Sequence, residues 1–340
     1  MQGTKGTAMT DTALLTGIPA AHREVFLSLA VRDAMDDLRR AMAQPRPVLQ
    51  AGTVSEDGAA IAGRDGWLFL HAGNNQWNEQ AAGHLTLTPD GLVLWAALLQ
   101  QRRQAMAQQG RRYAHLFVPE KSCVYPEWQR EPQAPSPQRP VVQLMAHLAA
   151  QGVQDVHYPL AALRAGIGLA PTFHRGNSHW TAWGAYLACR ALWPRLGIEV
   201  SDTPPPLLQR PAQQDLSVKF DNQADENWHE LDVGPWLAYT NEAQVPGHQG
   251  RFKHLHNPQA QNHCRVLIFG DSYAYDAHLA AWFALQCRDV FCVWQLGVQQ
   301  TLIDQLSPDV VITEMAERFA TRLPVDQLPS PSETLAAVPA

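Results

Sequence analysis

The sequence predicts an α/β protein, a three-layer α/β/α sandwich around a mainly parallel sheet. Several short segments are apolar without alternation, which is typical of strands that are buried on both faces. These segments alternate along the chain with stretches in which apolar residues recur at helical spacing. The chain has 340 residues, of which 46% are apolar, so it can bury a core of the size that such a sandwich needs.

Residues 1–60 are predicted to precede the sandwich. Residues 1–15 indicate a disordered lead, and helical spacing of apolar residues predicts a helix from Pro19 to about Gln44. Pro45 and Pro47 end that helix, because proline lacks the N–H that a helix interior requires. Residues 50–60 are small and polar and are interpreted as a linker.

The first half of the predicted domain, which spans residues 61–322, begins with a turn and a short strand over 63–70. Thr88 is a good helix N-cap and Pro89 suits a first turn, so a helix is expected to about Gln109. The remaining elements expected in this half are a strand at 113–118, a Pro-rich loop at 131–140, a helix at 140–151, a strand at 153–158 and a helix at 183–193.

The second half of the predicted domain begins with an irregular segment and then returns to alternating strands and helices. Residues 201–250 are rich in Pro, Gln and Asn and are interpreted as a long excursion with some short strands. The further elements expected are strands at 265–269, 290–295 and 309–313, helices at about 276–287 and 298–306, and a loose Pro-rich tail at 323–340.

Charge and hydropathy exclude several functions. The net charge is −6 and only 17% of the residues are charged, so the chain offers no broad basic surface for nucleic acid or anionic lipid. No apolar run approaches the roughly 20 residues that span a membrane. The N-terminal stretch is a poor signal peptide because Pro19 interrupts it. If the chain is complete, these features predict a cytoplasmic protein.

Metal and disulfide chemistry are not expected. The five cysteines are odd in number and scattered, which argues against both a disulfide framework and a zinc site. His254, His256 and His263 are close in sequence, but apart from Cys264 they have no nearby carboxylate or cysteine at ligand spacing. We therefore predict no metal, and no dinucleotide or P-loop fingerprint indicates a cofactor.

The residues Gly270, Asp271 and Ser272 directly follow the buried strand at 265–269 and precede a helix. In open α/β sheets, ligands bind outside the carboxyl ends of the strands, so a serine at this position projects its hydroxyl into the crevice. Backbone N–H groups near the helix start can stabilise an oxyanion there. The alternative is that Asp271 and Ser272 only cap the helix.

A second motif supplies a candidate base. Asn177-Ser178-His179-Trp180 stands just before an apolar helical stretch, so His179 has a hydrogen-bonding partner two residues upstream. Taken alone, His179 is more typical of a structural histidine beside Trp180.

Taken together, the two motifs resemble the SGNH-hydrolase-like domain of the bacterial alginate O-acetyltransferases. In that family an Asp-x-His-Trp motif precedes a Gly-Asp-Ser motif, in circularly permuted order relative to ordinary SGNH esterases. Other stretches over about 60–320 agree with the resemblance: Gly63 to Phe69, Val118 to Lys121, Val124 to Glu127, Asp215-Leu216 with Lys219, Pro308 to Val311, and Glu317 to Phe319.

The resemblance implies that Ser272 is the nucleophile and His179 the general base. The acidic member of the family's triad falls on Asn177, which can accept a hydrogen bond from the imidazole but brings no charge. In serine proteases the corresponding Asp-to-Asn change costs about 10⁴-fold in kcat. Three interpretations follow: a slower enzyme, an acid supplied from elsewhere, with Asp215 and Asp271 as the nearest candidates, or a degenerate site. We favour a working site.

Further residues are candidates for the oxyanion hole or the cleft. They are Gly270, Asp271 and Tyr273 at the nucleophile turn, Arg318 after the strand at 309–313, and Lys121 and Tyr125 after the strand at 113–118. Arg318 could supply positive charge, or it could pair with Glu314 or Glu317. Lys121 and Tyr125 could equally have packing roles.

The resemblance also implies the activity and its setting. It points to a carbohydrate O-acetyltransferase or acetylesterase that works through an acyl-enzyme and needs an acyl donor as co-substrate rather than a cofactor. The implied partners are a carbohydrate and an acyl-donor protein or membrane acyltransferase, and the implied location is periplasmic or exported. The alternative is a catalytically degenerate carbohydrate-binding or assembly protein, for which Asn177 is the best argument.

Overall fold

A seven-stranded sheet organises the protein in a computed structural model. The model describes residues 36, 40, 49–132, 134–200, 207–212, 214–220, 226–231, 234, 239–243 and 247–328. The strand order is β4-β3-β11-β9-β10-β8-β7. The strands are β3 (Arg112–Val118), β4 (Val156–His157), β7 (Tyr239–Ala243), β8 (Phe252–His256), β9 (Asn262–Gly270), β10 (Cys287–Trp294) and β11 (Val310–Ala316). The first five strands of this order are parallel, and β8 and β7 add an antiparallel edge.

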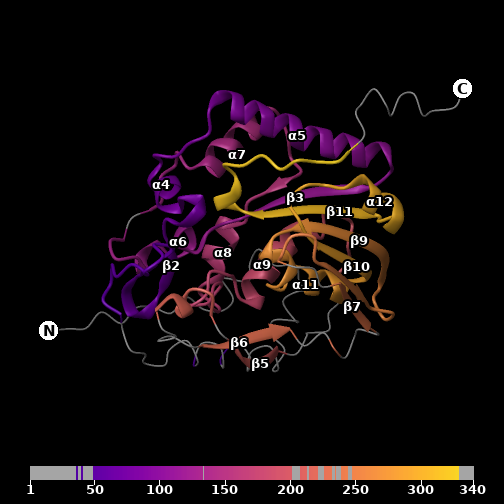
Figure 1. The fold of residues 1–340 in the computed structure, drawn as a ribbon. Helices are drawn as coiled ribbons and strands as arrows, with labels where there is room; N and C mark the ends of the chain where they lie inside the picture. Colours follow the sequence, from indigo (N-terminus) through magenta and orange to yellow (C-terminus); the bar gives the residue numbers. More distant parts are fainter. Residues whose placement is uncertain are drawn as a thin grey trace, which may run out of the picture.

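Helices cover both faces of the sheet, which confirms the predicted three-layer α/β/α sandwich (Figure 1). One layer contains α5 (Pro89–Gln108), α7 (Pro140–Ala150) and α12 (Gln300–Leu306). The other contains α8 (Leu160–Gly166), α9 (Ala182–Leu192) and α11 (Leu279–Gln286). Each buried strand contributes alternate side chains to the two layers. On β9, Val266 and Ile268 join the α9–α11 core, while Leu267 and Phe269 join the α5–α12 core.

Smaller elements surround one end of the sheet. They are β1 (Ala60–Ala62), the 3-10 turns η1 (Arg64–Gly66) and η2 (Gly73–Asn75), β2 (Leu68–Leu70), α4 (Trp77–Ala82), α6 (Lys121–Val124), η3 (Pro126–Trp128), η4 (Ser217–Phe220) and η5 (Glu317–Phe319). A separate hairpin pairs β5 (Leu207–Ala212) with β6 (Glu226–Leu231). The short strand expected over 63–70 is β2, whereas β1, which begins where the expected linker at 50–60 ends, was not expected.

The helix expected at about 276–287 begins later in the structure, and a short helix that the sequence did not indicate precedes it. A four-residue helix, α10 (Ser272–Tyr275), follows β9 directly, and α11 begins at Leu279. His278 lies between them with φ of 71°, a left-handed conformation that a continuous α-helix cannot contain. The break turns the chain behind the nucleophile turn, and helical spacing of apolar residues alone does not reveal it.

The sequence predicts that the domain ends at residue 322, but the segment that follows, up to residue 328, contacts the domain. Asp326 forms a two-point ion pair with the fully buried Arg102 of α5, with Nε–Oδ2 and Nη2–Oδ1 distances of 2.8 and 2.7 Å. The same carboxylate accepts the backbone N–H of Val298 at 2.8 Å. The domain therefore extends at least through residue 328, and the remainder of the expected tail, 329–340, lies outside the described residues.

The N-terminal predictions fall mostly on residues that the structure does not describe. The expected disordered lead at 1–15 lies wholly outside the described residues. Of the helix expected from Pro19 to Gln44, only Asp36 and Arg40 are described, and both are helical. Among the described residues, none of the helices has the length and apolar character needed to cross a membrane.

Candidate active site

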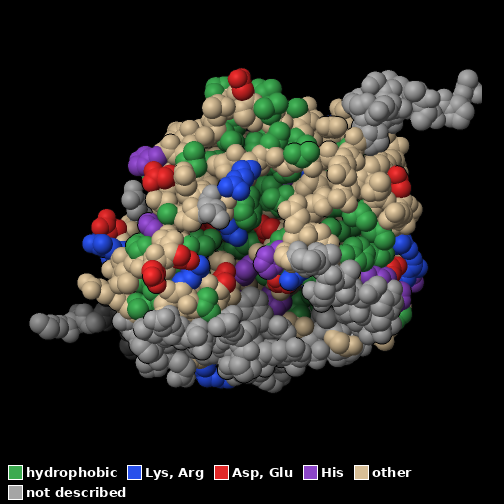
Figure 2. Space-filling model, in the orientation of Figure 1, with side chains coloured by type: hydrophobic (Ala, Val, Ile, Leu, Met, Phe, Trp, Pro, Cys, Tyr) green, Lys and Arg blue, Asp and Glu red, His purple; other side chains and the backbone are tan. Residues whose placement is uncertain are grey.

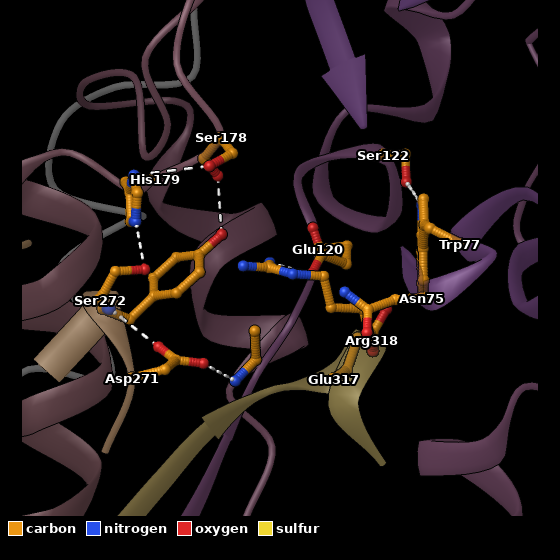
Figure 3. Close-up of polar contacts among 12 residues, drawn as sticks. Asn75, Trp77, Glu120, Ser122, Ser178, His179, Asp271, Ser272, Glu317 and Arg318 are labelled. Atoms are coloured by element: carbon orange, nitrogen blue, oxygen red, sulfur yellow. Dashed lines mark hydrogen bonds and ion pairs between the residues drawn. The ribbon is translucent and has the colours of Figure 1, made fainter. Parts of the chain in front are cut away.

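The predicted nucleophile turn, Gly270-Asp271-Ser272, lies where β9 meets α10, at the carboxyl edge of the parallel strands. Asp271 is the N-cap of α10: its Oδ1 accepts the backbone N–H of Tyr273 at 2.9 Å. Its Oδ2 accepts the backbone N–H of Ala316, at the end of neighbouring β11, at 2.8 Å (Figure 3). Asp271 thus ties the turn to the next strand and leaves the hydroxyl of Ser272 free to face the crevice.

Glycine is needed at position 270 because neighbouring side chains leave no room for a Cβ, and not because of its φ and ψ angles. A Cβ placed on Gly270 would lie 2.5 Å from Oε2 of Glu314 and 2.6 Å from Cβ of Ala274. Glu314 is buried beneath the turn, and its Oε2 accepts the backbone N–H of Asp271 at 3.1 Å. Burial, and then the nearby carboxylate of Asp271, raise the pKa of Glu314 well above its usual range.

The loop that carries His179 is held by a buried lysine. Lys121 Nζ donates to the backbone carbonyls of His174, Arg175 and Asn177 at 3.0, 3.0 and 2.7 Å. Its side chain is 2% exposed, so it acts as a clamp beneath the loop and does not line the cleft. The backbone N–H of His174 donates to the carbonyl of His179, which closes the loop on itself.

Ser272, His179 and Asn177 form a continuous hydrogen-bonded line. His179 Nε2 lies 2.7 Å from Ser272 Oγ (Figure 3), and on the other side of the ring Nδ1 lies 2.7 Å from Asn177 Oδ1. Asn177 Oδ1 also accepts the backbone N–H of His179 at 2.9 Å. Because Nδ1 donates to an amide oxygen, Nε2 carries the lone pair that faces the serine. Burial lowers the pKa of His179, which keeps the imidazole in the neutral form that a base requires.

Two tyrosines predicted as cleft candidates support this line from behind. The ring of Tyr273 lies 4.8 Å from the imidazole of His179, and its hydroxyl donates to the carbonyl of Ser178 at 2.7 Å. Tyr125 is buried further away and accepts the backbone N–H of Thr172 at 2.8 Å. Tyr273 therefore contacts His179 directly, whereas Tyr125 is buried farther from the imidazole.

Arg318 follows β11 and lies next to the nucleophile turn. Its Nη1 pairs with Oε1 of Glu120 at 2.6 Å, so its partner is neither Glu314 nor Glu317, the two that the sequence suggested. Its guanidinium carbon is 5.8 Å from the ring centroid of Tyr273. Burial raises the pKa of Glu120 to about 7, although Arg318 acts in the opposite direction. Figure 3 shows the guanidinium between Glu120 and the side of the site that holds Ser272.

The residues of the site therefore follow the carboxyl ends of three neighbouring strands. β3 ends before Glu120, β11 ends before Arg318, and β9 ends before Ser272. In the space-filling view, acidic, basic and histidine side chains gather at the centre of the face where these strand ends lie (Figure 2). On the far side of the Glu120–Arg318 pair, near Ser122 and Trp77, a cavity of about 490 Å³ has polar lining groups that include Asn78 and His84.

Sequence reasoning missed the partners that come from distant segments. Glu120 directly precedes Lys121 in a stretch that was singled out, but nothing in the sequence indicates its pairing with a residue 198 positions away. Asp215 was named only as one of two possible acids, and the structure places it beside His179, with Oδ2 3.7 Å from Nδ1.

The histidines that had suggested a metal site acquire a carboxylate from another strand. His254 Nε2 and His256 Nδ1 lie 3.0 and 2.8 Å from Oδ1 of Asp289, and Arg288 donates to Oδ2 at 3.1 Å. Each oxygen of Asp289 thus lies within hydrogen-bond distance of at least one side-chain nitrogen. After the cost of burial, these three hydrogen bonds hold the pKa of Asp289 down to about 2.

A mainly parallel sandwich with a serine at the strand–helix turn and a histidine in hydrogen-bond reach is typical of SGNH-hydrolase-like domains. A family profile described as the SGNH hydrolase-like domain of acetyltransferase AlgX matches residues 60–301. The chain therefore belongs to this family.

Solved structures share the fold at low sequence identity. The O-acetyltransferase domain of Pseudomonas putida AlgJ superposes with a TM-score of 0.52 at 19% identity, covering 82% of this chain and 98% of that one. Bacillus cereus PatB1 gives 0.56 at 12% identity, covering 82% and 98%. A DHHW family protein from Eubacterium siraeum gives 0.54 at 13% identity, covering 82% and 96%. Among curated proteins, no sequence matches the chain significantly.

Proposed function

We propose that this protein transfers an acetyl group to a hydroxyl group of a carbohydrate through an acyl-enzyme formed on Ser272. The observation that carries the proposal is the 2.7 Å contact between His179 Nε2 and Ser272 Oγ at the carboxyl edge of the sheet. Membership of the AlgX acetyltransferase family supports the reaction class. The O-acetyltransferase domain of AlgJ, which shares the fold, is consistent with it.

The first half-reaction forms the acyl-enzyme. His179 Nε2 takes the proton of Ser272 Oγ as the oxygen attacks the carbonyl carbon of an acetyl donor, and a tetrahedral intermediate forms. The bond to the donor's leaving oxygen then breaks, and His179 returns the proton to that oxygen. Asn177 holds Nδ1–H throughout, so that Nε2 remains the acceptor.

The second half-reaction runs the same steps with a sugar hydroxyl. His179 removes the proton of the hydroxyl, its oxygen attacks the acetyl carbonyl, and Ser272 leaves with the proton from His179. Water in place of the sugar gives hydrolysis, so transferase and esterase differ only in which hydroxyl reaches the acyl-enzyme.

Two groups favour negative charge at the acyl oxygen. The backbone N–H of Ser272, at the start of α10, makes no hydrogen bond within the described part of the chain and can donate to an oxyanion. The guanidinium of Arg318 adds positive potential beside Tyr273. Glu120 holds Arg318 in place, and as a carboxyl whose pKa is raised to about 7 it cancels only part of that charge near neutral pH.

The test is acetyl transfer from p-nitrophenyl acetate by the wild type, Ser272→Ala and His179→Ala. We expect release of p-nitrophenol, an acetyl adduct on Ser272 by mass spectrometry, and passage of that acetyl group to an oligosaccharide. His179→Ala should lose about 10²- to 10⁴-fold in rate, the usual contribution of a general base. If a folded wild type shows no turnover that depends on Ser272, the proposal fails and a carbohydrate-binding or assembly role is favoured.

A further inference from the structure

The proposed reaction leaves an electrostatic question at His179. When the imidazole takes the serine proton it becomes a cation, and a triad carboxylate normally stabilises that cation. Asn177 occupies the position of the carboxylate, where its amide oxygen orients the ring but carries no charge. The negative charge therefore has to come from another residue, or the imidazolium forms in a buried site without compensation.

Asp215 is placed to supply that charge. Its Oδ2 lies 3.7 Å from His179 Nδ1, on the same edge of the ring that Asn177 contacts. Asp215 Oδ1 accepts the backbone N–H of Ser178 at 2.7 Å, and Oδ2 accepts the Ser178 hydroxyl. The Ser178 hydroxyl oxygen is in turn 3.4 Å from His179 Nδ1. Ser178 thus fastens the carboxylate beside the imidazole.

The segment around Asp215 is anchored independently of these contacts. Leu216 is buried in a cluster with Ala60 and Leu68. The backbone N–H of Ser217 donates to the carbonyl of Gly176, one residue before Asn177. Because Leu216 and Ser217, the two residues after Asp215, are fixed in this way, the carboxylate stays near the ring although its side chain is 41% exposed.

We propose that Asp215 replaces the missing triad carboxylate, so that one residue orients the base and another supplies its charge. Asn177 keeps the 2.7 Å hydrogen bond to Nδ1. The carboxylate of Asp215, 3.7 Å from the same nitrogen, stabilises the positive charge of the imidazolium. Asp215 is accordingly a positioning and electrostatic residue that acts through His179. This inference rests on the proposed function, in which His179 is the general base.

Other charged groups also act on His179, and they do not remove the need for Asp215. After burial, Asp215 has the largest influence on the His179 pKa, and it acts upward. Arg318 lowers that pKa, and Asp271 and Asp276 raise it by less. His278, buried on the other side, is itself held neutral, because burial, followed by the influence of His179 and Lys253, lowers its pKa to about 3.

The decisive experiment moves the carboxylate from one position to the other. The variants are Asp215→Asn, Asn177→Asp and the double variant Asn177→Asp/Asp215→Asn, with Asp276→Asn as the control for an exposed carboxylate that also influences His179. We expect Asp215→Asn to lower kcat on p-nitrophenyl acetate by about 10- to 100-fold. An opposite charge at this range shifts a pKa by roughly 1–3 units, and the 41% exposure of Asp215 places its effect in the lower part of that range. The double variant should recover most of that loss, and Asp276→Asn should change kcat less than about threefold, because its charge is solvent-screened.

A second readout does not depend on turnover. NMR titration of the His179 ring should show a lower pKa in Asp215→Asn and a higher pKa in Asn177→Asp than in the wild type. Loss of kcat in Asp215→Asn without a change in the His179 pKa, or without recovery in the double variant, would mean a merely structural role and would overturn the inference. If Ser272-dependent turnover is absent but the His179 pKa still falls in Asp215→Asn, the proposed function fails while the pairing of Asp215 with His179 holds.

Discussion

Glu314 lies beneath the predicted nucleophile turn and accepts the backbone N–H of Asp271. We expect its burial to lower the free energy of unfolding of the protein near neutral pH. It is fully buried and held neutral, because burial and the neighbouring Asp271 raise its pKa well above 4.5. In the unfolded chain the same group loses its proton above about pH 4.5. A carboxyl whose pKa is raised in the folded state contributes its full stability below 4.5 and loses it as the pH rises toward the folded pKa.

The size of this effect follows from the linkage relation. Each pH unit above 4.5 costs about 1.4 kcal/mol for one such group until its folded pKa is reached. Glu314 therefore lowers the free energy of unfolding near neutral pH, by an amount set by how far its folded pKa is raised above 4.5. Glu314→Gln keeps the size of the side chain, an acceptor for the Asp271 N–H and a donor toward the Asp271 carboxylate, but it has no proton to lose on unfolding.

Urea unfolding of the wild type, Glu314→Gln and the exposed control Glu56→Gln between pH 5 and 8 tests this reasoning. The stability advantage of Glu314→Gln over the wild type should grow with pH, and Glu56→Gln should show no such trend. Turnover that depends on Ser272 should persist in Glu314→Gln, because Asp271 retains its hydrogen bonds to Tyr273 and Ala316. A difference between Glu314→Gln and the wild type that is constant across this range would refute a neutral Glu314.

Three further predictions concern the domain end, the turn and the base. Asp326→Ala should lower the free energy of unfolding, measured in urea, by about 3–5 kcal/mol, because it leaves Arg102 charged and buried without its partner. Adding Arg102→Met should recover much of this loss, and additive losses in the double variant would contradict the ion pair. Gly270→Ala should cost about 1–3 kcal/mol and reduce esterase turnover, because its Cβ would overlap Glu314; unchanged unfolding and turnover would argue against that contact. The acid limb of kcat/KM should have its midpoint below pH 6.5, because burial lowers the pKa of His179; a midpoint above 6.5 would show that the neutral base is not favoured by its surroundings.

Much of the fold could be predicted from the sequence because its signals are local. Non-alternating apolar segments mark strands that are buried on both faces, and all four predicted strands of this kind, at 113–118, 265–269, 290–295 and 309–313, lie in the central sheet. Strand β8 was missed because Phe252–His256 is mostly polar, and only its pairing with β10 shows that it belongs to the sheet. The break at His278 was missed because a left-handed φ at one residue does not change the spacing of the apolar residues around it.

The site residues likewise fall into those that a contiguous motif indicates and those that only the tertiary structure brings together. The turn at Gly270-Asp271-Ser272 and the motif around His179 are each contiguous, so their residues and order were sufficient to suggest a nucleophile and a base. The sequence by itself thus determined the fold class and the Ser272–His179 pair. Only the tertiary structure decided that Glu120 pairs with Arg318 and that Asp215 stands beside His179. These partners come from separate segments, and the distance between two charges depends on how packing places the segments, which no local pattern records.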